Sequence, residues 1–549
     1  MTRTPQKRPH DNTSLSSRRP FPYTPEPDYP GSAETMNRHV IFFLLFALLF
    51  PCNNMLAEDI FLPKQSELNR DFDERDEKMF LHPDKVYYPE IWVDCLGGNL
   101  SKKGILADLE AIAGGGFSGV QFFFGNRGGL WPGVDTPILC LTPEWDDFVR
   151  YAAQEAQRLG LRFTLQNCPG WAMAGGPWIE PDNSMRHLVW SETQINGGRK
   201  TEILLPCHPH RETEWRDYKD LMVLAFPTPL GSTRHLLPQH TESDMPQLPW
   251  HECLMSGWHP FHIPATQADK PHWVEITMPK AETVRTIEFS SVQGFSHWFC
   301  YEPGVNVKME AIYEGGDTLT ILHTDMPASN WQDNMPISLS CTEAAPTRTY
   351  RLSITNRNNM TISSLRLLSA ARKNNWESEA AWTLRNIMYN NEEPGHPKEA
   401  YVDRNRVTDL SKLTDEEGWL RWDAPEGEWT VLRIGHVNSG MKNAPAPPEA
   451  TGWECNKFDT EGAEKHFDGY IGRLKRGPLA GLLDGMLLDS WECETQTWTK
   501  DMETEFRKMT GYDLRPWLPA LMGYVIDTPE TTSRFLRDWR GTINELVVN

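Results

Sequence analysis

Apolar and polar residues alternate with two different periods along the first part of the chain. Three short, mostly apolar runs predict buried strands, at residues 90–99, 117–124 and 161–167. The two segments between them carry apolar residues at helical spacing, at residues 101–116 and 142–160. Ser101 and Thr142 stand where the N-terminal caps of these helices belong. Strands that alternate with helices predict a parallel sheet, and repetition of this unit is typical of a (β/α)8 barrel or a doubly wound sheet.

The pattern changes beyond about Thr201, where short alternating strands are separated by Gly, Asn and Asp turns. These strands predict an antiparallel β-sandwich, at residues 272–292, 304–324 and 347–370. The alternation of strands and helices then resumes, with strands predicted at 427–440 and 483–490 and helices at 460–477, 499–511 and 530–549. We therefore predict an α/β fold in which a (β/α)8-type barrel is interrupted by an inserted antiparallel β-sandwich domain.

The residues before the first predicted strand contain one apolar run, from Val40 to Phe50, which follows a basic start. This run is shorter than the roughly 20 residues that span a bilayer, so it predicts an export signal that begins at Met36. We expect an exported protein, in the periplasm or on the outer surface. Cys52 is a candidate lipid-attachment site, although Pro51 stands where a small residue is normally found.

The predicted domain boundaries follow from these changes of pattern. They are a disordered or mis-started tail at 1–35, a signal peptide at 36–57, the first part of the barrel at 58–205, the inserted β-rich domain at 206–400 and the second part of the barrel at 401–549. The last helical pattern reaches Asn549 with no following strand, so we expect the barrel to be incomplete.

Composition excludes several classes of function. A net charge of -21 argues against nucleic-acid binding, which needs clustered Lys and Arg, and suits a neutral small-molecule partner. The stretch GGGFSG at 114–119 has the letters of a dinucleotide-binding loop, but it ends a predicted helix instead of opening one. The ten cysteines contain no CxxC pair, and Cys207, His208 and His210 lack the second cluster that would complete a metal site.

Polar residues follow four of the predicted strands. They are Asn99, Asn167, His436 and the acidic stretch 489–492. Because the carboxyl ends of barrel strands meet on one face, we expect these side chains to converge on a site. Any one of them alone is more often a helix cap or a loop hydrogen bond.

The acidic stretch offers the chemistry of glycoside hydrolysis, which needs one protonated and one ionised carboxyl group. Glu492 fits the general acid, because Trp491 beside it offers an apolar wall that would keep the carboxyl group protonated near neutral pH. Asp489 lies three residues earlier and supports this interpretation. The alternative is a solvent-facing glutamate at a strand end, and we expect Glu494 to lie on the surface.

Three tryptophans in loops rich in Gly and Pro offer flat faces on which the C–H groups of a sugar could pack: Trp131, Trp171 and Trp178. The alternative is that they fill the core at the mouth of the barrel. For Trp178 the two interpretations are equally favoured.

Five segments, in this order along the chain, carry a family resemblance: GGNLSKKGILADLEAIAGGGFSGVQFFF, RLGLRFTLQNCPGWAMAGGPWI, WTVLRIGH, WECNKFD and DSWECETQTWT. Together they resemble glycoside hydrolase family 106, the α-L-rhamnosidases of bacteria that degrade plant polysaccharides. The resemblance implies a (β/α)8-type catalytic barrel with β-sandwich insertions, an inverting mechanism and a calcium ion near the bound sugar. It makes Glu492 the general acid. It also places further residues in the pocket, namely Asn99, Asn167, Trp171, His436, Glu454 and Lys457.

Two positions depart from the family pattern. Asp94 stands where the family leads us to expect histidine or an aromatic residue, and Asn456 stands where many relatives have aspartate. If either residue touches the sugar or the metal, specificity or ion binding differs from the family's.

The sequence supports two hypotheses of different classes. The first is an exported α-L-rhamnosidase that cleaves terminal α-L-rhamnose from plant-type polysaccharides or glycosides, of which this chain is the N-terminal part. Family members continue through further strands that bring the second catalytic carboxylate. The second is a catalytically incomplete, sugar-binding remnant of such an enzyme. A lyase or an unrelated sugar hydrolase on the same barrel is a third option. The expected partner is a rhamnose-containing glycan, and the sequence indicates no protein partner.

Overall fold

The computed structural model describes residues 71–126, 129–207, 217–232, 235–267, 270–290, 293–294, 304–329, 333, 335–386 and 393–548. The chain divides into two units between Leu81 and His82, and helix α3 (Glu74–Leu81) is the described part of the first. The predicted tail, the export signal and Cys52 lie outside the described residues, as do His208 and His210. Within the described ranges, no helix combines the length and the apolar character that a membrane crossing requires.

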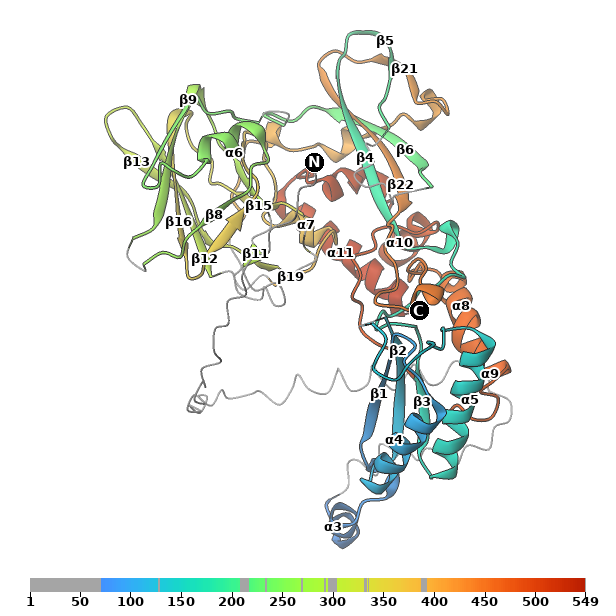
Figure 1. Ribbon diagram of the computed structural model, residues 1–549. Coiled ribbons are helices and arrows are strands. Elements are labelled where there is room, and N and C mark those ends of the chain that lie inside the picture. Colours follow the sequence, from blue (N-terminus) through green and yellow to red (C-terminus); the bar gives the residue numbers. More distant parts are fainter. Residues whose placement is uncertain are drawn as a thin grey trace, which may run out of the picture. The chain divides into compact units, whose positions relative to one another are not determined.

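The second unit contains a four-stranded parallel sheet in the spatial order β1-β2-β3-β23. Figure 1 labels its first three strands. Its strands are β1 (Glu90–Leu96), β2 (Gly119–Gly125), β3 (Arg162–Gln166) and β23 (Gly485–Leu487). The connections between the first three strands are the helices α4 (Lys102–Gly114) and α5 (Pro143–Arg158). The alternation of strands and helices predicted for residues 90–167 is confirmed.

Both predicted helix caps are present. The Ser101 hydroxyl accepts a hydrogen bond from the amide of Gly104 at 3.0 Å, and the Thr142 hydroxyl accepts one from the amide of Trp145 at 3.3 Å. Each cap satisfies an amide that has no partner within its helix.

One face of the parallel sheet packs against these helices. The core there includes the strand residues Phe122, Phe124, Phe163 and Leu165 and the α5 residues Trp145, Phe148 and Val149. Because successive side chains of a strand point to opposite faces, the intervening residues of β3, Thr164 and Gln166, belong to the other face.

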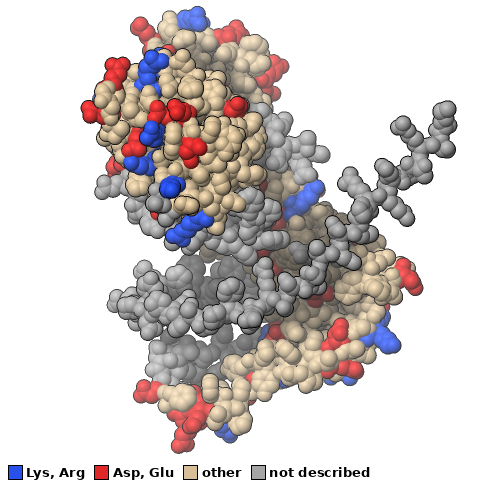
Figure 2. Space-filling view, turned by 60° about the vertical axis from the view of Figure 1, so that its left-hand side comes forward, with Lys and Arg blue, Asp and Glu red and all other residues tan. Residues whose placement is uncertain are grey.

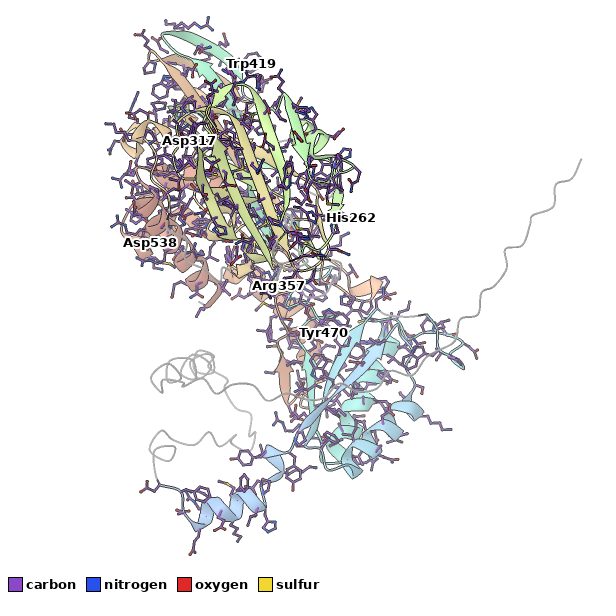
Figure 3. All side chains as sticks on the ribbon, turned by 90° about the vertical axis from the view of Figure 1, so that its left-hand side faces the viewer. His262, Asp317, Arg357, Trp419, Tyr470 and Asp538 are labelled. Carbon is purple, nitrogen blue, oxygen red and sulfur yellow. The ribbon has the colours of Figure 1, made fainter. Side chains whose placement is uncertain are left out.

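Strand β23 joins this sheet after a long excursion of the chain. Three helical segments precede it: α8 (Thr460–Phe467), the π-helical turn η7 (Asp468–Gly472) and α9 (Arg473–Arg476). The helix predicted at 460–477 is therefore interrupted by a π turn. Tyr470 of this turn is buried in the core of the parallel sheet, and Figure 3 labels it.

The middle of the chain forms antiparallel sheets. The largest has five strands in the order β13-β12-β16-β9-β7, and two further sheets have three strands each, β15-β10-β18 and β11-β17-β8. The long strands are β9 (His272–Glu282), β12 (Val305–Ile312), β13 (Thr318–Asp325) and β16 (Thr347–Asn356). The shorter ones are β7 (His240–Ser243), β8 (Phe261–Ile263), β10 (Thr286–Phe289), β11 (Gln293–Gly294), β15 (Ile337–Ser340), β17 (Met360–Ile362) and β18 (Leu365–Leu368). Strands from the five-stranded sheet and from both smaller sheets contribute to one apolar core.

The surface of these sheets carries charges of both signs. Acidic and basic side chains are interspersed on the face that Figure 2 shows. Some of them pair across strands, as Arg351 does with Glu275 at 2.8 Å. His262, Asp317 and Arg357, labelled in Figure 3, belong to this part of the chain.

A separate four-stranded antiparallel sheet has the order β20-β6-β22-β4. Its strands are β4 (Arg186–Asn196), β6 (Lys219–Pro227), β20 (Thr408–Asp409) and β22 (Glu428–Asn438), and β5 (Arg199–Leu204) pairs with β21 (Trp419–Ala424) beside it. The prediction that residues 427–440 return to the strand and helix alternation of the parallel sheet is wrong, because β22 pairs antiparallel with both β4 and β6. A continuous apolar run fits a buried strand of either kind, and here the neighbouring strands decide which kind forms.

The last described residues are helical. The helices α10 (Met502–Thr510) and α11 (Pro529–Val548) agree with the two predicted helices. The 3-10 segment η8 (Arg515–Met522) lies between them and was not predicted. Phe506, Leu518 and Trp539 of these helices pack with residues of β4, β6 and β22 in a second core.

Candidate active site

The loops that follow β3 and β23 leave the parallel sheet side by side. The amide of Asn167 donates to the carbonyl oxygen of Leu487 at 2.9 Å, and this bond continues the pairing of the two strands to their carboxyl ends. The acidic stretch that starts at Asp489 therefore begins next to Asn167, as the sequence predicted for polar residues at the ends of parallel strands.

A chain of polar contacts runs through the acidic stretch. Gln166 Nε2 donates to Asp489 Oδ2 at 2.9 Å, and the amide of Ser490 donates to Asp489 Oδ1 at 2.7 Å. The Ser490 hydroxyl lies 3.3 Å from Asp489 Oδ1 and 3.1 Å from Glu492 Oε1. Asp489 is thus held from β3, while Glu492, whose side chain is exposed, is connected to it through Ser490.

Trp491 is held by two contacts, and the neighbouring Glu492 is exposed. Its indole nitrogen donates to the carbonyl oxygen of Glu494 at 3.0 Å. Its ring faces the ammonium group of Lys457, which lies 4.9 Å from the ring centroid. The indole therefore anchors the loop through a cation–π contact.

Lys457 and Glu454 form a buried ion pair beneath this loop. Lys457 Nζ lies 2.8 Å from Glu454 Oε2, and the two side chains are 6% and 1% exposed. Burial alone would lower the pKa of Lys457, but the carboxylate of Glu454 outweighs it and raises that pKa above its ordinary value. Nζ also contacts the sulfur of Cys493 at 3.6 Å. The family resemblance assigned both residues to the sugar pocket. In the structure, their contacts instead hold the loop 489–494.

Asn167 is buried between two segments. Its Nδ2 donates to the carbonyl oxygen of Met173 at 2.8 Å and lies 3.3 Å from Nε2 of His466. Burial lowers the pKa of His466 to about 4, so the ring is neutral at neutral pH. Nδ1 of the ring lies 3.1 Å from the amide nitrogen of Gly175, which donates to it, and 3.2 Å from the carbonyl oxygen of the same residue. Oδ1 of Asn167 has no hydrogen-bond partner among the described residues.

Asn99 ties the loop after β1 to the loop that carries Trp131. Its Oδ1 accepts from the amide of Trp131 at 2.9 Å, and its Nδ2 donates to the carbonyl oxygens of Leu96 and Gly129, at 2.9 and 3.1 Å. The side chain of Trp131 is half exposed. Asn99 therefore positions a tryptophan that is accessible to a ligand.

Trp171 belongs to a row of stacked aromatic rings. It stacks on Phe123 with ring centroids 5.3 Å apart, and Phe123 stacks on Trp92 at 6.3 Å. Trp171 is partly exposed, so one end of the row reaches the surface.

Trp178 packs as a core residue. It stacks on the buried Tyr470 at 6.0 Å, with an interplanar angle of 15°. Gly176 and Gly469 make room for it, because a Cβ at either position would lie 2.3 or 2.2 Å from the indole. Of the two interpretations left open, the contacts favour the core. One edge of Trp178 also lines a shallow pocket with Glu461 and Lys465.

We expected His436 at a carboxyl end of the parallel sheet, and this prediction is wrong. The residue lies on β22 of the antiparallel sheet. Its Nδ1 accepts a hydrogen bond from Nε of Arg186, and its ring lies 6.4 Å from that of Trp498. Burial, followed by the charges of Arg186 and Lys219, lowers the pKa of His436 to about 3. The ring is a neutral acceptor that holds Arg186 in the antiparallel sheet.

Comparison with known proteins decides the family. A model of the glycoside hydrolase family described as alpha-L-rhamnosidase matches residues 82–549. The chain belongs to this rhamnosidase family. A solved rhamnosidase from Novosphingobium sp. PP1Y is 29% identical with a TM-score of 0.66, over 86% of this chain and 45% of that one. A candidate beta-glucuronidase from Formosa agariphila is 26% identical over 86% of this chain and 28% of its own length. The chain thus spans less than half of either relative.

Two polar residues of this rhamnosidase-family site were missed by the sequence analysis. Gln166 holds Asp489, and Ser490 stands between Asp489 and Glu492. Gln166 could have been found from the sequence LRFTLQN, because Thr164 and Gln166 alternate with the buried Phe163 and Leu165 and Gln166 stands at the end of the strand. Ser490 could have been found because its hydroxyl group stands between Asp489 and Glu492 in the sequence DSWE.

The two departures from the rhamnosidase pattern have different surroundings. The side chain of Asn456 is buried and satisfied, because Oδ1 accepts from the amide of Phe458 at 3.0 Å and Nδ2 donates to the Thr499 hydroxyl at 2.9 Å. Asp94 is exposed on β1. Asn456 is therefore a structural residue of the segment that carries Lys457.

The calcium ion implied by the resemblance stays a prediction. Among the residues that the structure describes, no three or more His, Cys, Asp or Glu side chains are grouped so that they could hold a metal ion.

Proposed function

We propose that this chain is the part of an α-L-rhamnosidase that carries the general acid and part of the sugar pocket. The enzyme would release terminal α-L-rhamnose from plant-type polysaccharides or glycosides, with inversion at the anomeric carbon. The observation that carries the proposal is the position of Glu492, which is exposed and linked through Ser490 and Asp489 to the carboxyl end of β3. The family match over residues 82–549 supports the same chemistry.

In the proposed reaction, Glu492 gives its proton to the oxygen of the glycosidic bond as that bond breaks. A water molecule attacks the anomeric carbon from the opposite face, and a second carboxylate takes its proton. In inverting enzymes the two carboxyl groups are about 6.5–9.5 Å apart. Asp489 shares one hydroxyl with Glu492, so it lies on the acid's side of the sugar. We therefore assign the base to a residue outside the loop 489–494.

Two exposed aromatic side chains are our candidates for contact with the sugar ring. Trp131 is half exposed on the loop tied down by Asn99, and Trp171 is the partly exposed end of the aromatic row. A rigid indole packs against the C–H groups of a sugar with little loss of side-chain entropy. Trp178, His436, Glu454 and Lys457 instead act through packing and through the residues that they hold.

We propose further that the parallel sheet is part of a (β/α)8-type barrel and that the antiparallel sheets around residues 235–370 are a β-sandwich inserted into it. The parallel order β1-β2-β3-β23 supports the first statement, because β3 and β23 are adjacent although the insertion separates them in sequence. The common apolar core of the antiparallel sheets supports the second. Export to the periplasm or outer surface follows from the predicted signal at 36–57 and stays a prediction.

The decisive experiment is hydrolysis of an aryl α-L-rhamnoside by a full-length enzyme that contains this chain and by its Glu492→Gln variant. A general acid contributes about 10²–10⁴-fold to the rate, so we expect a loss of that order in kcat with binding of L-rhamnose preserved. Glu494→Gln is the matched control, since it removes an acid from the same loop, and it should keep the wild-type rate.

Undiminished turnover by Glu492→Gln would reject the assignment of the general acid. Binding of L-rhamnose without hydrolysis by the wild-type chain would support the sugar-binding alternative for this chain.

A further inference from the structure

The parallel sheet has a second face, opposite α4 and α5, and this face carries an exposed carboxyl group. Asp94 of β1 belongs to it, because its neighbours Val93 and Cys95 pack with the helices in the core. The side chain of Asp94 is exposed. Among the residues that the structure describes, its carboxylate has no hydrogen bond and no ion pair. Both of its oxygens can therefore accept hydrogen bonds from a ligand.

A row of aromatic rings crosses the second face beside Asp94. Phe123 is the residue of β2 that pairs with Asp94, and it stacks on Trp92 of β1 and on Trp171 of the loop after β3. Trp92 is 50% exposed, and Trp171 is partly exposed. The row thus presents apolar surface next to a carboxylate. A sugar needs this combination, because its C–H groups pack on aromatic rings and its hydroxyl groups bind polar atoms.

The loop that carries the candidate acid starts on the other side of the same row. The register of β2 with β3 places Gln166 beside Phe123, on the side away from Asp94. Because neighbouring strands lie about 4.8 Å apart, the Cα atoms of Asp94 and Gln166 are about 10 Å apart across β2. Gln166 in turn holds Asp489 at 2.9 Å. Asp94 and the start of the loop with Glu492 therefore flank the aromatic row from opposite sides.

We propose that Asp94 is a specificity-determining residue whose carboxylate accepts hydrogen bonds from two neighbouring hydroxyl groups of the sugar, an inference that rests on the proposed function. A terminal rhamnoside has free hydroxyl groups at C2, C3 and C4 of its ring. The two oxygens of a carboxylate accept from two such donors at once. The C–H groups of the sugar pack on Trp171, its hydroxyl edge reaches Asp94, and its glycosidic oxygen faces the loop with Glu492.

Asp94 contributes binding and no proton transfer in this role. The hydroxyl groups that it contacts take no part in the cleavage of the glycosidic bond, so the contact is made in the ground state and in the transition state alike. Loss of such a contact raises KM and leaves kcat unchanged. This behaviour separates Asp94 from a general acid or a general base, whose loss lowers kcat.

Asp94→Asn tests the contact in a full-length enzyme that contains this chain. The variant keeps the shape of the side chain, removes its charge and replaces one acceptor by a donor. Because hydrogen bonds to a charged group are strong, we expect L-rhamnose to bind about 10–100-fold more weakly in calorimetry. KM for an aryl α-L-rhamnoside should rise by a similar factor, with little change in kcat.

The matched control is Asp108→Asn. Asp108 is an exposed carboxyl group of α4, the helix that packs on the opposite face of the sheet. This variant removes the same charge but no group of the second face, so its affinity for L-rhamnose should equal that of the wild type. Equal weakening by Asp94→Asn and Asp108→Asn would assign the effect to net charge and would overturn the inference.

A sugar that lacks one hydroxyl group tests the same contact from the ligand's side. Every neighbouring pair among C2, C3 and C4 includes the hydroxyl group at C3, so 3-deoxy-L-rhamnose cannot make both hydrogen bonds. The wild type should bind it more weakly than L-rhamnose, and this difference should shrink in Asp94→Asn, because the two changes remove the same interaction. An equal difference in both proteins would overturn the inference.

The kinetic measurements have two further outcomes that would reject this role for Asp94. One is unchanged binding and kinetics in Asp94→Asn. The other is a loss of kcat with unchanged affinity for L-rhamnose, which would assign Asp94 to proton transfer instead of recognition.

The same measurements separate this inference from the proposed function. Hydrolysis of rhamnosides by the wild type, with unchanged affinity in Asp94→Asn, would reject the inference and leave the function standing. A wild type that neither binds nor hydrolyses rhamnosides would reject the function. D-mannose, L-fucose and D-glucose then serve as the probes. Binding of one of them that Asp94→Asn weakens would leave the inference standing, and binding of none, or binding that the variant does not change, would overturn it.

Discussion

The ammonium group of Lys457 lies between the carboxylate of Glu454, 2.8 Å away, and the ring of Trp491, whose centroid is 4.9 Å away. This contact joins the segment after β22 to the loop that carries the candidate acid. Both members of the ion pair are buried, so each depends on the other for its charge.

Removing Lys457 alone should be strongly destabilising. Lys457→Met leaves the carboxylate of Glu454 buried without a counter-charge, which costs about 3–5 kcal/mol in the free energy of unfolding. Urea titration followed by tryptophan fluorescence measures this loss. The double variant Lys457→Met with Glu454→Gln removes both charges and should recover most of it. A double variant no more stable than the single one would contradict the ion-pair interpretation.

Acid should destabilise the fold through His466. Its pKa is lowered by burial to about 4 in the folded chain, against about 6.5 for an ordinary histidine. Between these values the unfolded chain binds a proton that the folded chain does not. The contribution of His466 is therefore fully present above about pH 6.5 and is lost as the pH falls toward 4. We expect a loss of about 2 kcal/mol between pH 7 and 5, measured by urea unfolding.

The matched control for this pH dependence is His466→Gln. Glutamine keeps polar atoms near Asn167 and Gly175 but takes up no proton, so its stability should fall less over the same interval. Equal pH dependence in the two proteins would show that other groups are responsible.

Substitution of Trp131 and of Trp178, both of which were proposed from the sequence as sugar contacts, should have different effects on stability. Trp178→Ala removes a ring stacked on Tyr470 and should lower the free energy of unfolding by about 3 kcal/mol. Trp131→Ala removes a half-exposed ring and should change it by less than about 0.5 kcal/mol. Binding of L-rhamnose, measured by calorimetry, should weaken in Trp131→Ala. The opposite pattern of stability effects would contradict the packing described for Trp178.

The cap of helix α5 gives a prediction that is independent of the site. Thr142→Ala removes the oxygen that accepts from the amide of Trp145, at a cost of about 1 kcal/mol. Thr142→Ser keeps the oxygen and should retain most of the stability. Thermal unfolding distinguishes the two variants, and equal destabilisation would assign the effect to the methyl group instead.

The parts of the fold that the sequence predicted well depend on neighbours in the chain. Helices α4 and α5 begin at Ser101 and Thr142 because caps act within three residues, and apolar periodicity then marks the buried face. The placing of Asp489 beside Asn167 followed from a similarly simple rule, since parallel strands end at the same edge.

Other features could not be predicted because they depend on residues far apart in sequence. The run at 427–440 suits any buried strand, and only its pairing with β4 and β6 makes it antiparallel and moves His436 away from the parallel sheet. The family resemblance placed Glu454 and Lys457 among the pocket residues. Their burial and mutual pairing arise from the packing of the 489–494 loop above them.

The pairing of β3 with β23 also constrains the order of folding. Gln166 and Asp489 are 323 positions apart, and the antiparallel sheets lie between them in sequence. During synthesis from the N-terminus, β1, β2, β3 and their helices are complete long before β23 emerges. Contacts of such long range form slowly, because closing a long loop costs entropy before the contact stabilises it. Gln166 is therefore in place early in folding. The loop with Asp489 and Glu492 joins it late.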